Sequence, residues 1–318
     1  MNDDSPTISL PGIRLPQLLT RQKPVAPYPL LVSSQMVEIH DIPTLPDPRS
    51  DVATRGTKTQ PVHHIEIGVG WHTGTLRQRR PNEDSLVTLQ GTCTYNGRLV
   101  PFGLFVVADG MGGHFFGQEA SQMVIQSMMQ SVLRDMLKSE DISDTTCIEI
   151  LTSGAEEANA IICQYSIDKN KDMGTTLTAA LLIEGKAHII NVGDSRTYCY
   201  REGQGLSQIT YDHSLVANLV AQGVITPDEI YTHPERNKIY RCVGTTEGVE
   251  VDWFTIDVHQ YDRLLLCSDG LWEMVRDAEI ERILKYNTDA KEMSKQLVQA
   301  ALDAGGADNI GLIVVHML

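Results

Sequence analysis

Aspartate residues stand next to apolar runs at four separate places in the sequence. Asp109 follows the run at 105–108, and Asp269 follows a second run after one serine. Asp194 and Asp308 are weaker copies, one after an apolar run and the other just before one. A carboxylate at the end of a buried strand is costly unless it has a strong partner, and the commonest partner is a cation. We therefore expect these side chains to meet at a cation site.

The residue types around these aspartates indicate which cation they bind. No cysteine or histidine pattern accompanies them, so the expected ligands are all oxygen atoms. Hard oxygen ligands favour Mg²⁺ or Mn²⁺ over zinc or copper. The glycine after the aspartate, as in Asp109-Gly110, lets the backbone approach an ion closely. One such pair is usually only a turn, but turns alone are a poor explanation for four aspartates on separate strands.

A loop with charges of both signs precedes the strand expected at 85–90. Arg79 lies four residues before Glu83 and five before Asp84. These side chains could form only an ion-pair cluster on the surface. The strand at 85–90 is expected to form a hairpin with the strand that leads to Asp109, because Asn-Gly between them is a strong turn signal. In that position the loop becomes a candidate grip for an oxyanion beside the metals.

The elements that must position these residues follow from the spacing of apolar side chains. Recurrence every three or four positions predicts helices, and short apolar or alternating runs predict strands. The predicted helices are 117–138, 148–165, 277–286 and 289–304. The predicted strands are 65–71, 85–90, 99–108, 175–183, 186–192, 197–201, 206–210, 251–256, 263–267 and 310–315.

The order of these elements predicts an α+β protein. The connections between 175 and 210 are too short for parallel crossovers, so the sheets are expected to be antiparallel. A short helix is expected between Ser214 and Gly223, and Thr226 is expected to begin another, with proline at its first position. We expect a four-layer sandwich of two central sheets covered by helices, with the carboxylates at one end.

Composition narrows the class of function. The chain has 318 residues and a net charge of −15, from 41 acidic and 26 basic side chains. This charge argues against a nucleic-acid partner that needs a basic surface. Six scattered cysteines without a Cys-x-x-Cys pair indicate reduced thiols and a cytoplasmic protein. No apolar run is long enough to span a bilayer.

Residues 1–62 differ from the rest of the chain. Ten of the 14 prolines lie there, with Tyr28 as the single aromatic residue. Such a segment buries too little surface to offset its ordering entropy, which predicts a flexible arm or linker. It could be a functional tether, a plain tail or a linker from a larger assembly. The folded domain is expected at 63–318.

Six motifs in their order along the domain resemble those of the metal-dependent protein phosphatases of the type 2C (PPM) family, in their bacterial form. They are Arg79-x-x-Asn82-Glu83-Asp84, Asp109-Gly-Met-Gly-Gly113, Gly174-Thr175-Thr176, Val192-Gly-Asp194-Ser-Arg196, Ser268-Asp269-Gly270-Leu271 and Asp308-Asn309-Ile310. The resemblance implies the family's α-β-β-α sandwich. It also implies a flap at about 212–241 that influences substrate access.

The resemblance implies a role for each matching residue. Asp109 would bridge two tightly bound Mg²⁺ or Mn²⁺ ions, Arg79 would orient the substrate phosphate, and Asp194 with Asp269 would bind a weaker third ion. The remaining implied roles are the Gly110 carbonyl, Asp269 and Asp308 as the other ligands of the two ions, Asp84 with Glu83 holding metal-bound waters, and Asn309 supporting the ligands. Many eukaryotic members have a histidine where this chain has Met111, which cannot donate a proton; a metal-bound water is then the expected acid.

By the same resemblance, the chain would hydrolyse phosphoserine and phosphothreonine in proteins with a water activated at a binuclear centre. It would reverse the action of a serine/threonine kinase, and no covalent phosphoenzyme would form. Two alternatives remain. One is a catalytically silent binding or regulatory module on the same fold, although such members usually lack some of the metal aspartates. The other is a metal-dependent phosphodiesterase acting on nucleotides, which the acidic charge and the motif order disfavour.

Overall fold

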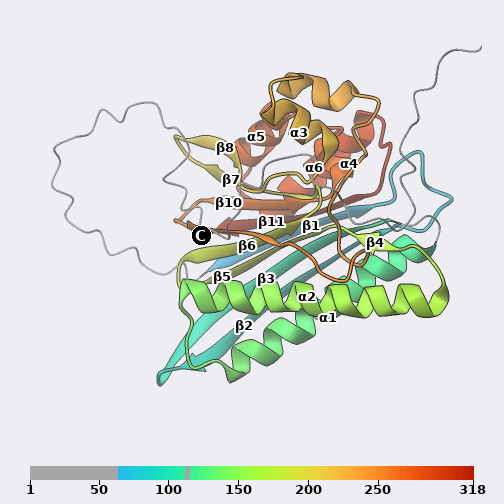
Figure 1. Ribbon diagram of the computed structural model, residues 1–318. Helices are drawn as coiled ribbons and strands as arrows, with labels where there is room; N and C mark the ends of the chain where they lie inside the picture. Colours follow the sequence, from blue (N-terminus) through green and yellow to red (C-terminus); the bar gives the residue numbers. More distant parts are fainter. Residues whose placement is uncertain (1–63, 112–114) are drawn as a thin grey trace, which may run out of the picture. The chain divides into compact units, whose positions relative to one another are not determined.

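The computed structural model describes residues 64–111 and 115–318 of the chain (Figure 1). The predicted arm at 1–62 lies outside the described residues.

Two antiparallel sheets form the centre of the domain. The first sheet has the order β1 (Ile65–His72), β11 (Ile310–Met317), β10 (Arg263–Cys267), β7 (Arg196–Arg201) and β8 (Gly205–Gln208). The second has the order β2 (Asp84–Tyr95), β3 (Arg98–Met111), β5 (Leu177–Ile183), β6 (Lys186–Val192) and β9 (Asp252–Asp257), with β4 (Gly174–Thr175) paired to β3. The two sheets bury a shared apolar layer that contains Phe105 and Ile313.

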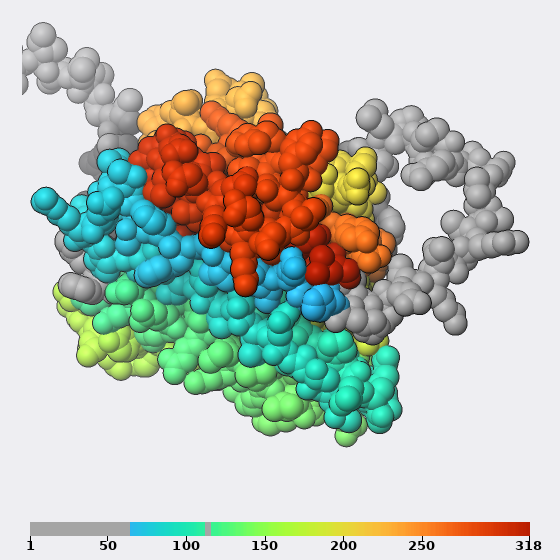
Figure 2. Space-filling view, turned by 180° about the vertical axis from the view of Figure 1, so that it is seen from behind, coloured from blue at the N-terminus to red at the C-terminus, as the bar shows by residue number. Residues whose placement is uncertain are grey.

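Helices cover the outer face of each sheet (Figure 1). Helices α1 (Phe115–Lys138) and α2 (Asp144–Lys169) pack on the second sheet. Helices α4 (Asp269–Trp272), α5 (Asp277–Tyr286) and α6 (Ala290–Asp303) pack on the first sheet. Seen from behind in Figure 2, the orange and red C-terminal segments lie above the blue and cyan strands, and the green helices lie below them. The predicted four-layer α+β sandwich is therefore confirmed.

The sequence patterns explain why these elements form. In α1, the side chains of Ala120, Val124, Met128 and Val132 recur every four residues and are all fully buried, as an amphipathic helix requires. Helix α2 begins after Ser143, whose side chain accepts a hydrogen bond from a backbone N–H of the first turn.

The turn between β2 and β3 shows the same agreement between sequence and structure. Asn96 and Gly97 have φ values of 47° and 74°, which is the left-handed conformation that a two-residue hairpin turn needs. The resulting hairpin runs much further than the sequence predicted. Strand β3 continues to Met111, so Asp109 lies within the strand and pairs directly with Asp84.

Other boundaries also differ from the predictions. Asp269 begins helix α4 instead of ending a strand, and α2 begins at Asp144, four residues before the predicted 148. The segment after Thr226 is the 3-10 helix η2 (Pro227–Thr232), which is tighter and shorter than an α-helix. Interactions with residues outside each segment determine where these elements begin and end. The local sequence pattern carries no information about those interactions.

The segment at 212–241, predicted to be a flap, holds α3 (Leu215–Ala221) and η2. Its two ends are joined by an isolated bridge between Ser214 and Ile239. Its first residues therefore lie beside its last ones, and the segment leaves and re-enters the sandwich at one place.

Two expectations from composition can also be compared with the structure. All six cysteines are free thiols, as predicted. None of the helices in the described ranges combines the length and the apolar character of a membrane-spanning segment.

Candidate active site

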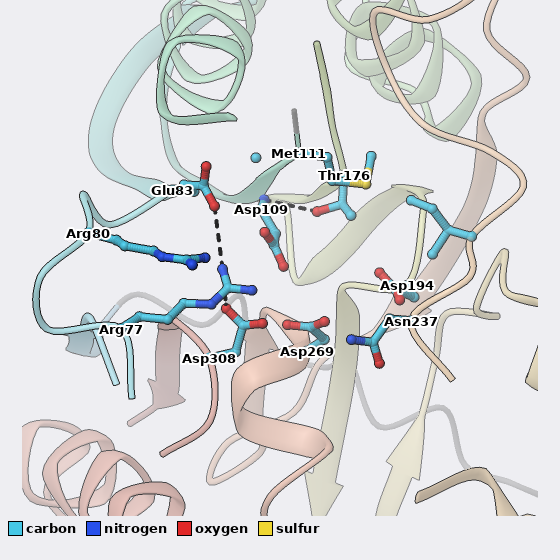
Figure 3. A pocket seen from close by; sticks show the side chains of 12 residues that line it. Arg77, Arg80, Glu83, Asp109, Met111, Thr176, Asp194, Asn237, Asp269 and Asp308 are labelled. Atoms are coloured by element: carbon cyan, nitrogen blue, oxygen red, sulfur yellow. Dashed lines mark hydrogen bonds and ion pairs between the residues drawn. The ribbon is translucent and has the colours of Figure 1, made fainter. Parts of the chain in front are cut away.

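A cavity of about 270 Å³ is lined by residues of strand β3, of helix α4, of the loops around them and of the segment at 212–241 (Figure 3). The lining residues are Arg77, Arg80, Glu83, Asp109, Gly110, Met111, Thr176, Asp194, Asn237, Ile239, Asp269 and Asp308. Six residues predicted from the sequence are thus brought together. Asp84 and Asn309 contact members of this group without lining the cavity. Arg79 is the one predicted site residue that the structure does not bring into the group.

Backbone hydrogen bonds fix the position of Asp109. Its N–H donates to Thr176 Oγ1 at 2.9 Å, and its carbonyl accepts from Thr176 N at 2.8 Å. Asp84, directly opposite, accepts a 2.7 Å hydrogen bond from Ser268 Oγ through Oδ2. The Gly174-Thr-Thr and Ser268-Asp-Gly motifs therefore hold the two aspartates from either side.

Gly110 has its place because no larger residue fits there. A Cβ atom added to it would lie 1.9 Å from the carbonyl oxygen of Gly117 in α1, far inside van der Waals contact. Its N–H donates to the Glu83 carbonyl at 3.1 Å. The backbone after Asp109 is thus pressed between the charged loop and helix α1.

Asp194 lies in the turn between β6 and β7 and is held by its neighbours. Its carbonyl accepts a 2.9 Å hydrogen bond from Trp272 Nε1 of α4. Gly193 donates through its N–H to His213 Nδ1 at 2.9 Å, and its carbonyl accepts from the His213 N–H at the same distance. The turn that carries Asp194 is therefore bonded to the start of the segment at 212–241.

Two more side chains connect the loops around the cavity. Asn309 Oδ1 accepts from Glu83 N at 2.8 Å, and its amide nitrogen donates to the Thr73 carbonyl at 3.0 Å. Arg77 lies 2.7 Å from Asp308 Oδ1 and 3.4 Å from Glu83 Oε2 (Figure 3). These contacts tie both ends of the charged loop to the loop before β11.

The aspartates form a strongly anionic cluster. Burial raises the pKa of Asp84 and of Asp194 to about 7 in each case. Burial, and then the charge of neighbouring carboxylates, holds the pKa values of Asp109 and Asp269 well above their ordinary value. Burial also raises the pKa of Asp308. Because like charges in a low-dielectric site disfavour ionisation, the cluster is stable as carboxylates only beside added positive charge.

The donor set fits hard divalent cations. Asp84 Oδ1 and Asp269 Oδ1 are buried and find no hydrogen-bond partner among the described residues. Within the ranges 64–111 and 115–318, no three acidic or histidine side chains converge tightly enough to form a complete cage for one ion. Such a cage is not what Mg²⁺ requires, because Mg²⁺ keeps several of its waters and uses one or two carboxylates. Oxygen donors around a cavity with room for water match that preference.

The arginines of the charged loop differ from the motif-based expectation. The Arg80 N–H donates to the Arg77 carbonyl at 2.8 Å, so these two residues are the first and last of a turn. The ends of such a turn lie within about 7 Å of each other, and its middle residues form the tip. Arg77 and Arg80 therefore line the cavity, whereas Arg79 lies at the exposed tip. The sequence motif identifies an arginine only by its distance from Glu83 along the chain. It does not contain the turn that decides which arginines line the cavity.

Comparison with known proteins identifies the family of the chain. The family profile described as protein phosphatase 2C matches residues 73–304. This chain belongs to the protein phosphatase 2C family. The resemblance seen in the sequence and the predicted sandwich fold are both confirmed.

Bacterial members of the protein phosphatase 2C family are similar in sequence. The serine/threonine phosphatase stp of Listeria monocytogenes serotype 4b (strain F2365) is 40% identical over 219 residues, which cover 67% of this chain and 84% of stp. The serine/threonine protein phosphatase PstP of Mycobacterium tuberculosis (strain ATCC 25618 / H37Rv) is 36% identical over 217 residues, which cover 68% of this chain and 40% of PstP.

Solved structures of protein phosphatase 2C relatives share the fold. The serine/threonine phosphatase Stp1 from Staphylococcus aureus has a TM-score of 0.69 and 34% identity, with 83% of this chain and 100% of that chain covered. The catalytic domain of the serine/threonine protein phosphatase PstP in complex with two manganese ions has a TM-score of 0.65 and 31% identity. That match covers 79% of this chain and 97% of the PstP chain.

Three features of this protein phosphatase 2C site were missed in the sequence. Asn237 and Ile239 line the cavity from the segment at 212–241, and no local pattern distinguishes them from other loop residues. Glu273 is partly buried beside the aspartates, where its charge adds to the burial that raises the pKa of Asp194 and of Asp269. Its carboxylate lies 3.1 Å from the guanidinium of Arg236, which belongs to the segment at 212–241. Its position four residues after Asp269 was the available signal, because that spacing returns to the same helix face.

Proposed function

We propose that the chain hydrolyses phosphoserine and phosphothreonine in proteins, with a water activated at a binuclear Mg²⁺ or Mn²⁺ centre. The observation that supports this most is the convergence of four aspartates and two arginines on one cavity. Carboxylates suit divalent cations, and arginines suit phosphate oxygens. Within this proposal, the chain reverses the action of a serine/threonine kinase.

The residues around the cavity divide into a cation-holding side and a phosphate-holding side. Asp109, the Gly110 carbonyl, Asp269 and Asp308 would hold two ions, with Asp84 supporting their waters. Asp194 and Asp269 would hold a weaker third ion. When bound, the ions act as Lewis acids that neutralise phosphoryl charge and make water a better nucleophile at neutral pH.

The chain's own side chains position the phosphoryl group. We assign the phosphate grip to Arg77 and Arg80, because they line the cavity and Arg79 does not. Guanidinium groups bind phosphate oxygens through paired, charge-assisted hydrogen bonds. Met111 lines the cavity as well, and its thioether has no proton to give to a leaving group. We therefore assign the leaving-group proton to a water.

Removing divalent cations is expected to abolish hydrolysis of a phosphothreonine peptide, because the anionic cluster then lacks its partner charge. The purified chain is assayed with Mn²⁺, with Mg²⁺ and with excess EDTA. In parallel, Mn²⁺ at about 100 times its dissociation constant is expected to stabilise the folded chain by about 2.7 kcal/mol, measured as a rise in Tm. Turnover that persists in EDTA would contradict the metal assignment. Absence of turnover in a folded, Mn²⁺-stabilised protein would favour the silent binding module instead.

Replacing Arg80 with glutamine is expected to raise the KM for the same peptide by roughly tenfold, because one charge-assisted phosphate contact is lost. The kcat is expected to fall less, since the nucleophile is positioned by other residues. Arg80 is a cleaner test than Arg77, whose removal would also break two ion pairs. Arg282→Gln, at an exposed helix pair on α5, is the matched control. An unchanged KM in Arg80→Gln would remove Arg80 from the phosphate grip.

A further inference from the structure

Two neighbouring arginines stand out because their side chains are unpaired. In the part of the chain that the structure describes, every other arginine has a hydrogen bond, an ion pair or an aromatic ring as its partner. Arg79 and Arg80 have none, and both are exposed. The chain has 41 acidic and only 26 basic residues, and an unpaired guanidinium is the exception among the described arginines. Two adjacent unpaired arginines beside a cavity for an anionic substrate indicate that they bind a ligand.

The turn separates the roles of these two arginines. Arg80, at the end of the turn, lines the cavity and points into it from the side of Arg77 and Asp308 (Figure 3). Arg79, at the tip, is outside the cavity lining. Consecutive Cα atoms are only about 3.8 Å apart, so the Arg79 side chain starts beside Arg80, at the edge of the cavity, without lining it.

We propose that Arg79 selects phosphoproteins that carry an aspartate or glutamate within two residues of the phosphorylated side chain. This inference rests on the proposed function. Successive residues of an extended peptide are spaced by about 3.3 Å, which places a flanking carboxylate beside Arg79 when the phosphate lies at Arg80. The overall negative charge of the chain repels an acidic substrate, and a local cation at the entrance reverses that repulsion where it matters.

The test compares two phosphothreonine peptides that differ only in the four flanking positions, which are aspartate in one and asparagine in the other. The wild-type kcat/KM is expected to favour the aspartate peptide about fivefold at low salt, the upper range for an exposed ion pair. In Arg79→Gln the ratio is expected to fall to about 1, and Arg79→Lys, which keeps the charge, should retain most of it. Raising the ionic strength to about 1 M, where the Debye length is about 3 Å, should also reduce the wild-type ratio.

Each result decides between clear outcomes. Arg282→Gln keeps the wild-type ratio if the effect belongs to Arg79 and not to net charge. A ratio in Arg79→Gln equal to that of the wild type overturns the inference, as does an equal loss on both peptides, which would indicate a merely structural role. Equal wild-type rates on the two peptides contradict this inference alone. Failure of the wild type to hydrolyse either peptide with Mn²⁺ contradicts the proposed function and this inference with it.

Discussion

Asp109→Asn is expected to lower kcat/KM for a phosphothreonine peptide on the order of a thousandfold or more, while the domain stays folded. Asp109 is the central carboxylate of the cavity, and metal-ion catalysis supplies several kcal/mol at about 1.4 kcal/mol per factor of ten. The fold should survive because Thr176 binds the backbone N–H and carbonyl of Asp109, and the substitution leaves both in place.

The same variant should be more stable than the wild type when no metal is present. Burial raises the folded-state pKa of Asp109 above its unfolded value, so the ionised carboxylate opposes folding at neutral pH. This penalty is present above the folded-state pKa and disappears as the pH falls below the unfolded value. Asparagine removes it at every pH. We therefore expect a higher Tm in EDTA at pH 7, a smaller difference in acid, and loss of most of the Mn²⁺-induced rise.

Asp303→Asn, at the exposed end of α6, is the matched control because it removes the same charge outside the cavity lining. It should change neither kcat/KM nor the Mn²⁺-induced rise in Tm. Turnover in Asp109→Asn within tenfold of the wild type would sink the assignment of Asp109. An unchanged Mn²⁺ response would do the same without reference to activity.

Asp212→Ala is expected to lower the free energy of unfolding by about 3–5 kcal/mol, because it leaves a buried guanidinium without its counter-charge. Arg196 is 4% exposed and Asp212 is 7% exposed. Three hydrogen bonds of 2.7 to 3.1 Å join them, and the guanidinium also lies 3.6 Å from the centre of the Trp272 ring. Urea unfolding at fixed metal concentration measures the loss.

A surface pair provides the comparison for this loss. Glu279→Ala removes one partner of the exposed pair with Arg282, at 2.6 Å, and should cost less than about 1 kcal/mol. The double variant Arg196→Met/Asp212→Leu should recover much of the stability, because an apolar pair needs no desolvation of charge. If Asp212→Ala and Glu279→Ala lose similar amounts, burial does not set the strength of the Arg196–Asp212 pair.

The sequence predicted elements best where local signals bound them on both sides. The spans Lys186–Val192, Arg263–Cys267 and Asp277–Tyr286 agree with the prediction to the residue. Those ends are defined by glycine turns or by a change in the spacing of apolar residues along the sequence. The end of β3 was wrong because pairing of Asp109 with Asp84, and of Gly110 with Thr175, depends on residues distant in the chain.

The candidate site shows the same division. The aspartates could be found because an acid after an apolar run is a local signal with a clear physical cost. The arginines could not be ranked, because Arg77, Arg79 and Arg80 are equal as residue types. The hydrogen bond that closes the turn distinguishes them, and it belongs to the folded loop. Counting from Glu83 selected the one arginine of the three that does not line the cavity.

The turn that carries Asp194 has one further consequence. Gly193, just before Asp194, is hydrogen-bonded to His213, and Arg196, two residues after Asp194, is hydrogen-bonded to Asp212. The first two residues of the segment at 212–241 are thus bonded to the turn on both sides of Asp194. Under the proposed function, a cation bound by Asp194 and the position of this segment would therefore be coupled, and such a coupling is reciprocal. We expect an ion at Asp194 to change the binding of substrate by the same free energy with which the substrate changes the binding of that ion.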